Sequence, residues 1–245
     1  MKINGMARMD LEHWKARFCE IEKSDRHWEE GRSAWALAYF IAKHGGEDKI
    51  VEQINKILVD DRVVSLNIAE IECRCPFDGY RNARRQDMGI VGQTEKGKNV
   101  FIGIEAKVDE SFGPTVGEAI KAAEKYRKKH PTSKRVDRIS GLCEKFGVKP
   151  TDDGIDDLRY QLFHFTAGTA CAASNNGRDI LGTGDEIHVH VMLTLVFKTS
   201  KYNAQKGIAN KADYDRFIKR FFHKGLLKKC QLPARPYAIY CEIPL

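Results

Sequence analysis

The segment Val100–Val108 constrains the fold more than any other, because it combines a strict two-residue alternation of apolar side chains with two charges. One side of the expected strand carries Ile102, Ile104, Ala106 and Val108. The other side carries Gly103, Glu105 and Lys107. A carboxylate and an ammonium about 6–7 Å apart on an apolar strand are costly to desolvate. The pattern therefore indicates either a functional site on a buried strand or a surface ion pair on an exposed edge strand.

The preceding strand is expected to supply a third charge. Gln86–Gly92 reads as a short strand, and residues 95–99 read as the turn that connects it to Val100–Val108. If these strands form a hairpin, Asp87 lies beside Glu105. Two carboxylates at a strand junction favour a hard cation, Mg²⁺ with Mn²⁺ as the alternative, and the carbonyl of Ala106 is a further candidate ligand.

These groups match the requirements of phosphodiester hydrolysis. We expect Asp87, Glu105 and Lys107 to be catalytic, and Asp87, Glu105 and Ala106 to hold the metal. Lys107 is expected to orient or deprotonate a water, or to stabilise charge on a phosphoryl oxygen.

The rest of the chain predicts an α/β fold with a mixed central β-sheet flanked by helices. Residues 9–58 are helical by their apolar spacing, and the pattern changes to period two at residue 63. The further expected elements are strand Val63–Cys75, helices Val116–Lys129, Lys134–Phe146 and Ile155–Ala173, strand Glu186–Lys198, helix Ala212–Leu227 and strand Tyr237–Ile243. We expect residues 1–62 to form a helical N-terminal extension packed on a core of residues 63–245, in one continuous domain.

Asp87 followed eighteen positions later by Glu105-Ala106-Lys107, within an apolar strand, resembles the PD-(D/E)xK nuclease superfamily. In that superfamily an acid and an acid-x-lysine pair occupy adjacent strands, and the acid usually follows a proline, where this chain has Gln86. The resemblance implies a restriction-endonuclease-like αβββαβ core over about residues 63–197. It also implies a Mg²⁺-dependent nuclease, with DNA as the favoured substrate, acting in bacterial or phage defence or in repair.

Three further segments are similar to a bacterial protein family for which the resemblance implies no substrate. They are Gly31-Arg32-Ser33-Ala34, Glu105-Ala106-Lys107-Val108 with Glu110-Ser111-Phe112-Gly113, and Arg159-Tyr160-Gln161-Leu162. Some nucleases of the superfamily place a glutamine near the metal on the helix after the core motif. Gln161 is therefore a candidate substrate-binding residue, with a buried packing role as the alternative. Arg159 is expected to meet a phosphate or to form a surface ion pair.

Positive charge is concentrated between Lys121 and Lys149, where ten Lys or Arg residues stand against three acids, within a chain of net charge +7. Such a stripe suits a polyanion, although a solvated helix face has the same composition. We expect Lys121, Lys125 and Lys128 to bind substrate. The expected partner is a nucleic acid, and a homodimer is left open.

Composition excludes several other classes. The chain has 245 residues, of which 42% are hydrophobic and 31% charged, as in ordinary globular proteins. The longest apolar run is too short for a bilayer, and seven unevenly spaced cysteines favour reduced thiols in the cytoplasm. No dinucleotide-binding or Walker A motif is present. A catalytically inactive nuclease-fold module that binds nucleic acid or a partner protein remains the alternative function.

Overall fold

The computed structural model describes residues 1–81, 83–172, 182, 186–223 and 230–245. Its strands are β1 (Lys2–Ile3), β2 (Val63–Cys75), β3 (Arg84–Thr94), β4 (Asn99–Lys107), β5 (Val189–Lys198) and β6 (Tyr237–Pro244). Its α-helices are α1 (Leu11–Glu22), α2 (Ser33–Lys43), α3 (Gly46–Asn55), α4 (Val116–Lys129), α5 (Arg135–Lys145), α6 (Tyr160–Ala170) and α7 (Ala204–Ile218). A π-helical segment, Lys219–His223, continues α7.

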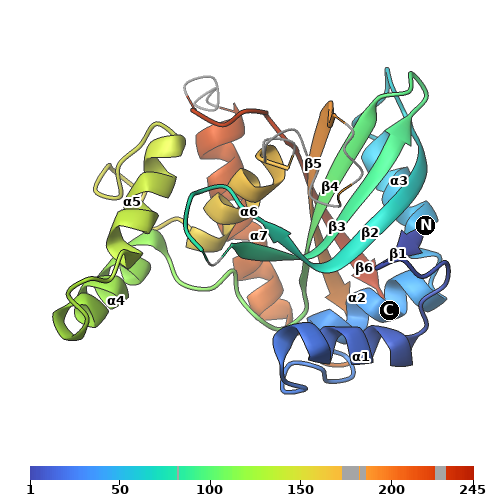
Figure 1. Cartoon of the computed structure of the whole chain (residues 1–245), viewed down its shortest axis with the longest axis horizontal. Coiled ribbons are helices and arrows are strands. Elements are labelled where there is room, and N and C mark those ends of the chain that lie inside the picture. The colour runs from blue at the N-terminus through green and yellow to red at the C-terminus, as the bar shows by residue number, and fades with distance from the viewer. Residues whose placement is uncertain (82, 173–181, 183–185, 224–229) are drawn as a thin grey trace.

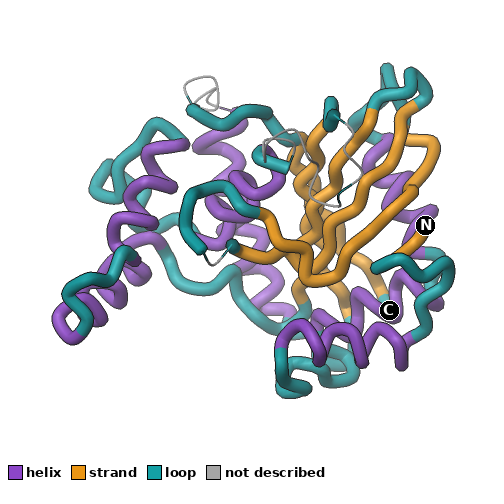
Figure 2. Tube along the Cα trace, in the orientation of Figure 1, coloured by secondary structure: helices purple, strands orange, loops and turns teal. Residues whose placement is uncertain are grey.

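The six strands form one mixed sheet in the order β1-β2-β3-β4-β5-β6 (Figures 1 and 2). Strands β2, β3 and β4 are antiparallel neighbours, whereas β4, β5 and β6 are parallel. The predicted α/β class, with a mixed sheet and helices before the strands, is confirmed. Among the described residues, no helix combines the length and apolarity that a membrane span requires.

Several element boundaries differ from the sequence prediction. Residues 155–158 form turns and a bend, and α6 begins at Tyr160. Ile155 and Leu158 are buried in this non-helical segment, so their apolar character did not indicate a helix. Helix α7 begins at Ala204, and the Asn203 side chain caps it by accepting from the backbone N–H of Lys206. Hydrophobic spacing does not reveal such a polar contact. The expected helix ends at Ala173 and Leu227 lie outside the described residues. Strand β1, which pairs with β2, was not predicted.

Helices cover both faces of the sheet. Helices α1, α2 and α3 pack on one face, in a core cluster that includes Trp14, Phe40 and Phe197. The opposite face carries α6 and α7, in a cluster that includes Phe163 and Phe217, and α4 and α5 lie beyond α6 (Figure 1). The alternation predicted for β4 is confirmed, since Ile102, Ile104 and Ala106 belong to the first cluster.

The β2–β3 hairpin bends sharply toward α6 near the end where Cys75 pairs with Arg84 (Figures 1 and 2). Glu72 lies at this bend and adopts φ 50°, a left-handed conformation that non-glycine residues rarely occupy. Ile71 packs into the cluster under α1–α3, while Cys73 packs with Phe101 in a separate buried cluster. A regular strand would place these two residues on the same side. The left-handed residue therefore interrupts the alternation and lets the hairpin curve over α6.

Gln86 fastens the bent hairpin to α6. Its Nε2 donates to the carbonyl of Phe165 at 3.2 Å and to Thr169 Oγ1 at 2.9 Å. Gly103 on β4 makes room for this contact, because a Cβ there would lie 2.1 Å from Gln86 Oε1 and 2.6 Å from Thr169 Oγ1. Gln86 therefore has a definite packing role at the position where the superfamily usually has proline.

We expect Gly103→Ala to destabilise the protein by about 1–3 kcal/mol, because the new methyl group must displace two buried, hydrogen-bonded side chains. Gly141→Ala is the matched control: no atom lies within 4 Å of its would-be Cβ, within helix α5. There the substitution should stabilise by about 0.5–1 kcal/mol through helix propensity. Urea denaturation of both variants measures the difference, and equal stability of the two would contradict the proposed packing.

Candidate active site

Asp87 lies where β3 separates from β4. The last pair of the ladder is Met88 with Ile104, so the next residue on β3 is Asp87 and the next on β4 is Glu105. Beyond this point the side chain of Asp87 replaces a strand carbonyl, because its Oδ2 accepts from the backbone N–H of Ala106 at 2.6 Å. The predicted hairpin is thus observed, and it brings Asp87 beside the Glu105-Ala106-Lys107 segment.

Glu105 is almost completely buried between β4 and α6, with a relative exposure of 3%. Its Oε1 accepts from Lys107 Nζ at 2.6 Å and from Gln161 Nε2 at 2.6 Å. The structure therefore brings three predicted site residues together in one hydrogen-bonded group. Gln161 reaches it because α6 packs directly over β4 and β5.

Lys107 is also buried, with a relative exposure of 5%. Its Nζ lies 5.5 Å from the centre of the Phe112 ring, which gives the ammonium an apolar and aromatic wall. Burial alone lowers the pKa of Lys107, but the negative charges of Glu105 and Asp87 outweigh burial and raise it. Lys107 is therefore an ammonium in this environment, which favours charge stabilisation over proton abstraction.

Asp87 has a pKa well above its ordinary value, because burial, Glu105 and Glu72 all disfavour its charged form. Glu72, on the neighbouring strand β2, has its pKa raised to about 8 by burial and by the nearby charges of Glu22 and Glu105. The site thus concentrates carboxyl groups that repel one another when ionised. A bound cation would relieve this repulsion, which is the electrostatic condition expected of a metal site.

The donor chemistry fits Mg²⁺. Asp87, Glu105 and the carbonyl of Ala106 are all oxygen donors, and Mg²⁺ usually binds one or two carboxylates and keeps several waters. Among the described residues, no group of three or more His, Cys, Asp or Glu side chains is placed to hold a metal ion. Water and substrate oxygens would therefore complete the coordination shell.

The lysines predicted to bind substrate lie apart from this site. Lys121, Lys125 and Lys128 are exposed and recur on α4 at spacings of four and three. At 100° per residue they lie opposite Ala119 and Ala123, which line a pocket on the inner side of the helix. The three lysines therefore form an outward-facing stripe on α4.

Arg159 is held by protein groups. Its Nε donates to Asp213 Oδ2 at 2.6 Å, and a guanidinium Nη1 donates to the carbonyl of Gly113 at 2.8 Å. The Asp213 side chain is only 4% exposed, so this ion pair is largely buried and joins the start of α6 to α7. Arg159 therefore forms an ion pair, but a largely buried one rather than the expected surface pair.

Sequence reasoning missed two acidic neighbours of the site. Glu72 gave no local signal, because strand β2 merely alternates and its left-handed backbone is a consequence of tertiary packing. Glu110 belongs to a segment that the sequence did single out. Burial opposes ionisation of Glu110, but Lys107 and hydrogen bonds from Ser33 and Val108 lower its pKa. Glu110 is therefore an additional fixed negative charge near the ammonium.

The raised pKa of Glu72 gives the apo protein a specific pH dependence. A carboxyl group that holds its proton more tightly when folded stabilises the protein at low pH. This contribution is lost as the pH rises from about 4.5, its ordinary value, through about 8. Glu72→Gln should remove this loss, so the variant should exceed the wild type in stability at pH 8 by more than at pH 5.

Urea midpoints measured at both pH values without divalent ions test this expectation. Glu95→Gln, exposed in the turn at the far end of the hairpin, is the control and should leave the profile unchanged. If Glu72→Gln follows the wild-type profile as well, Glu72 does not carry a raised pKa.

Comparison with known proteins gives one match. A family model described as Domain of unknown function (DUF6946) matches residues 9–238. No curated protein and no solved structure matches the chain. The matched segment includes helices α1 to α7 and the residues Asp87, Glu105, Lys107 and Gln161. Since the match extends over nearly the whole sequence, the chain belongs to the DUF6946 family.

Proposed function

We propose that this protein is a Mg²⁺-dependent nuclease of the PD-(D/E)xK type that hydrolyses phosphodiester bonds of DNA. One observation carries the proposal: Asp87 meets the Glu105-Ala106-Lys107 segment where two antiparallel strands diverge, with Lys107 buried beside Glu105. The element order also supports a restriction-endonuclease-like core, since α3 precedes β2, β3 and β4, and helices connect β4 to the parallel strand β5.

Asp87, Glu105 and the carbonyl of Ala106 would hold the ion, which when bound supplies a low-pKa water and draws charge from a phosphoryl oxygen. Ala106 is fixed for this role because its N–H is already engaged by Asp87. Lys107 contributes a permanent positive charge in a water-poor site, where it stabilises negative charge developing on the phosphate. Neutralisation of its Glu105 partner by a cation would leave the ammonium available for the substrate.

Gln161 is a positioning residue in this scheme. Its amide donates to Oε1 of Glu105 and fixes the position of that oxygen. Fixing Oε1 also limits where the second oxygen, Oε2, can lie. This arrangement depends on α6 rather than on the strands that carry the acids. Movement of α6 would therefore change the orientation of Glu105.

The cysteines bear on the cellular compartment. Among the described residues, Cys73, Cys75, Cys143 and Cys241 are buried thiols that form no disulfide. Buried free thiols persist in reducing surroundings. We therefore propose that the nuclease acts in the cytoplasm.

The roles of the three charged residues are separable. Asp87→Ala and Glu105→Ala should abolish both divalent-ion binding and cleavage, because each removes an oxygen ligand. Lys107→Ala should retain ion binding and lose about 10²–10³ in turnover, since lysine is not a ligand but stabilises developing charge. Plasmid and single-strand cleavage with Mg²⁺ or Mn²⁺ measures turnover, and titration calorimetry measures ion binding.

Lys96→Ala is the matched control, because Lys96 is exposed in the turn at the opposite end of the hairpin. It should cleave at the wild-type rate. Circular dichroism identifies variants that fail to fold, which matters for Lys107→Ala because breaking a buried ion pair costs about 3–5 kcal/mol. Wild-type turnover in a folded Lys107→Ala protein contradicts the assigned role. A wild type that binds DNA but cleaves with neither ion supports the non-cleaving module instead.

The lysine stripe on α4 predicts salt-dependent binding. If Lys121, Lys125 and Lys128 neutralise phosphates, replacing all three with alanine should flatten the plot of log affinity against log salt. On duplex DNA the slope should change by about 0.9 for each phosphate that the variant no longer neutralises. Fluorescence anisotropy across a salt series measures the slope. An unchanged slope places the DNA on another surface.

A further inference from the structure

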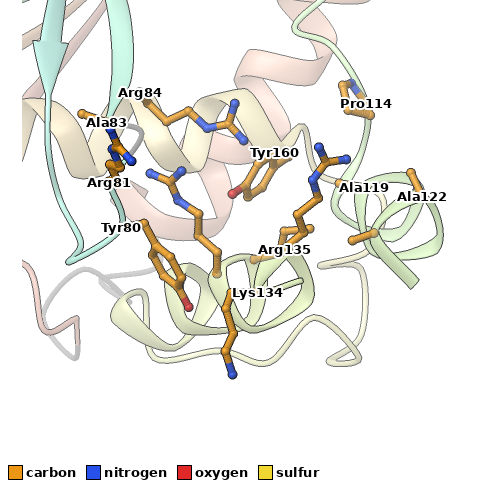
Figure 3. Close-up of a pocket in the computed structure, with 13 residues that line it drawn as sticks. Tyr80, Arg81, Ala83, Arg84, Pro114, Ala119, Ala122, Lys134, Arg135 and Tyr160 are labelled. Carbon is orange, nitrogen blue, oxygen red and sulfur yellow. The ribbon is translucent and has the colours of Figure 1, made fainter. Parts of the chain in front are cut away.

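A second concave feature lies beyond the start of α6. A pocket of about 730 Å³ is lined by Tyr80, Arg81, Ala83 and Arg84, by α4 and α5, and by the first residue of α6 (Figure 3). Pockets that bind small molecules usually measure about 300–1,000 Å³. Its volume therefore suits a ligand of about the size of a nucleotide.

The lining of this pocket is strongly basic. Five lining residues are cationic and none is acidic: Arg81, Arg84, Lys134, Arg135 and Arg138. Arg138 is oriented by a two-point ion pair with Asp78, at 2.7 and 3.1 Å. An arginine cluster in one concavity matches a doubly charged group with several acceptor oxygens, as in a phosphate monoester.

Two tyrosines complete the wall. Tyr80 is 36% exposed and stands at the rim, whereas Tyr160 is only 5% exposed. The Tyr160 hydroxyl makes no hydrogen bond of good geometry among the described residues, and Figure 3 shows it directed toward the pocket. The Arg84 guanidinium lies 5.6 Å from the centre of the Tyr160 ring. A buried hydroxyl in this condition is costly, so a ligand acceptor would satisfy it.

The pocket adjoins the candidate active site through α6. Tyr160 lines the pocket, while the next residue, Gln161, donates to Glu105. Burial lowers the pKa of His164, one turn further along, to about 3, and the charges of Arg84, Lys107 and Arg138 lower it as well. His164 is therefore neutral and adds no charge to this end of α6.

We propose that this pocket binds the terminal phosphate of a nucleic-acid strand, with the adjoining nucleotide against Tyr80 and Tyr160. The proposal rests on the nuclease function proposed above and deepens it, because it names phosphorylated strand ends as the preferred substrate. Because Tyr160 and Gln161 are successive residues, a strand end held in this pocket lies beside the residue that contacts Glu105.

Binding of fluorescent single strands, measured by anisotropy in EDTA, tests the proposal without cleavage. Three otherwise identical oligonucleotides carry a 5′-phosphate, a 3′-phosphate or hydroxyls at both ends. One phosphorylated end should bind about tenfold or more tightly than the unphosphorylated strand, as expected for a charge-assisted contact. Arg81→Ala and Arg135→Ala should each reduce this preference several-fold, and Tyr160→Phe should reduce it without loss of charge.

Arg62→Ala is the matched control, since Arg62 is exposed just before β2, at the opposite end of the hairpin. It removes the same charge and should keep the full preference. Equal affinity for all three strands, or a preference that survives in Arg81→Ala and Arg135→Ala, overturns the proposal. So does competition by a free nucleoside monophosphate as strong as by the phosphorylated strand, because the pocket then selects a free nucleotide. The proposed nuclease activity fails separately if phosphate-dependent binding persists while Mg²⁺ and Mn²⁺ give no cleavage.

Discussion

The buried contact among Glu105, Lys107 and Gln161 joins the central strand β4 to helix α6. Two opposite charges under α6 lose their hydration, and close hydrogen bonds of 2.6 Å must offset that loss. The contact is satisfied only when α6 lies directly over β4. Because α6 also provides the backbone carbonyl that anchors Gln86, the same docking fixes the bent β2–β3 hairpin. The geometry of the charged site and the path of the sheet therefore depend on one helix.

The bend of the hairpin has an electrostatic consequence. Where β3 leaves β4, the carboxylate of Asp87 takes over a strand hydrogen bond and is brought next to two other carboxyl groups. Glu72 reaches the same place only because its backbone is left-handed. Backbone strain at Glu72 and repulsion between carboxyl groups thus occur at the same corner of the sheet. Such strain and such perturbed groups are common where a protein binds a ligand.

Two successive residues of α6 face an acidic region and a basic region. Gln161 faces the acids of β4, and Tyr160 faces the arginine-lined pocket. This separation would suit the proposed nucleic-acid substrate, because cations would contact its backbone while the proposed metal site would act on one bond. The stripe of lysines on α4 is a third region, and it faces away from the pocket.

The sequence by itself determined the α/β class and the central charged strand. The alternation in Val100–Val108 is a local property, because successive side chains of any strand point to opposite faces. It correctly placed Glu105 and Lys107 opposite the apolar face, and the short turn before it indicated a hairpin with Asp87. A place for Gln161 near the site was also suggested, through resemblance to the superfamily, whereas its hydrogen bond to Glu105 was not.

Only the tertiary structure decided how distant segments meet. The basic pocket joins Arg84 to Arg135 and Tyr160, and no local period relates these positions. Helical spacing grouped Lys121 with its neighbours but gave no information on which side of α4 faces inward. The left-handed conformation of Glu72 likewise follows from the curvature that α6 imposes on the hairpin. Local patterns fix the direction of a side chain relative to its own element, whereas the packing of elements fixes what that side chain meets.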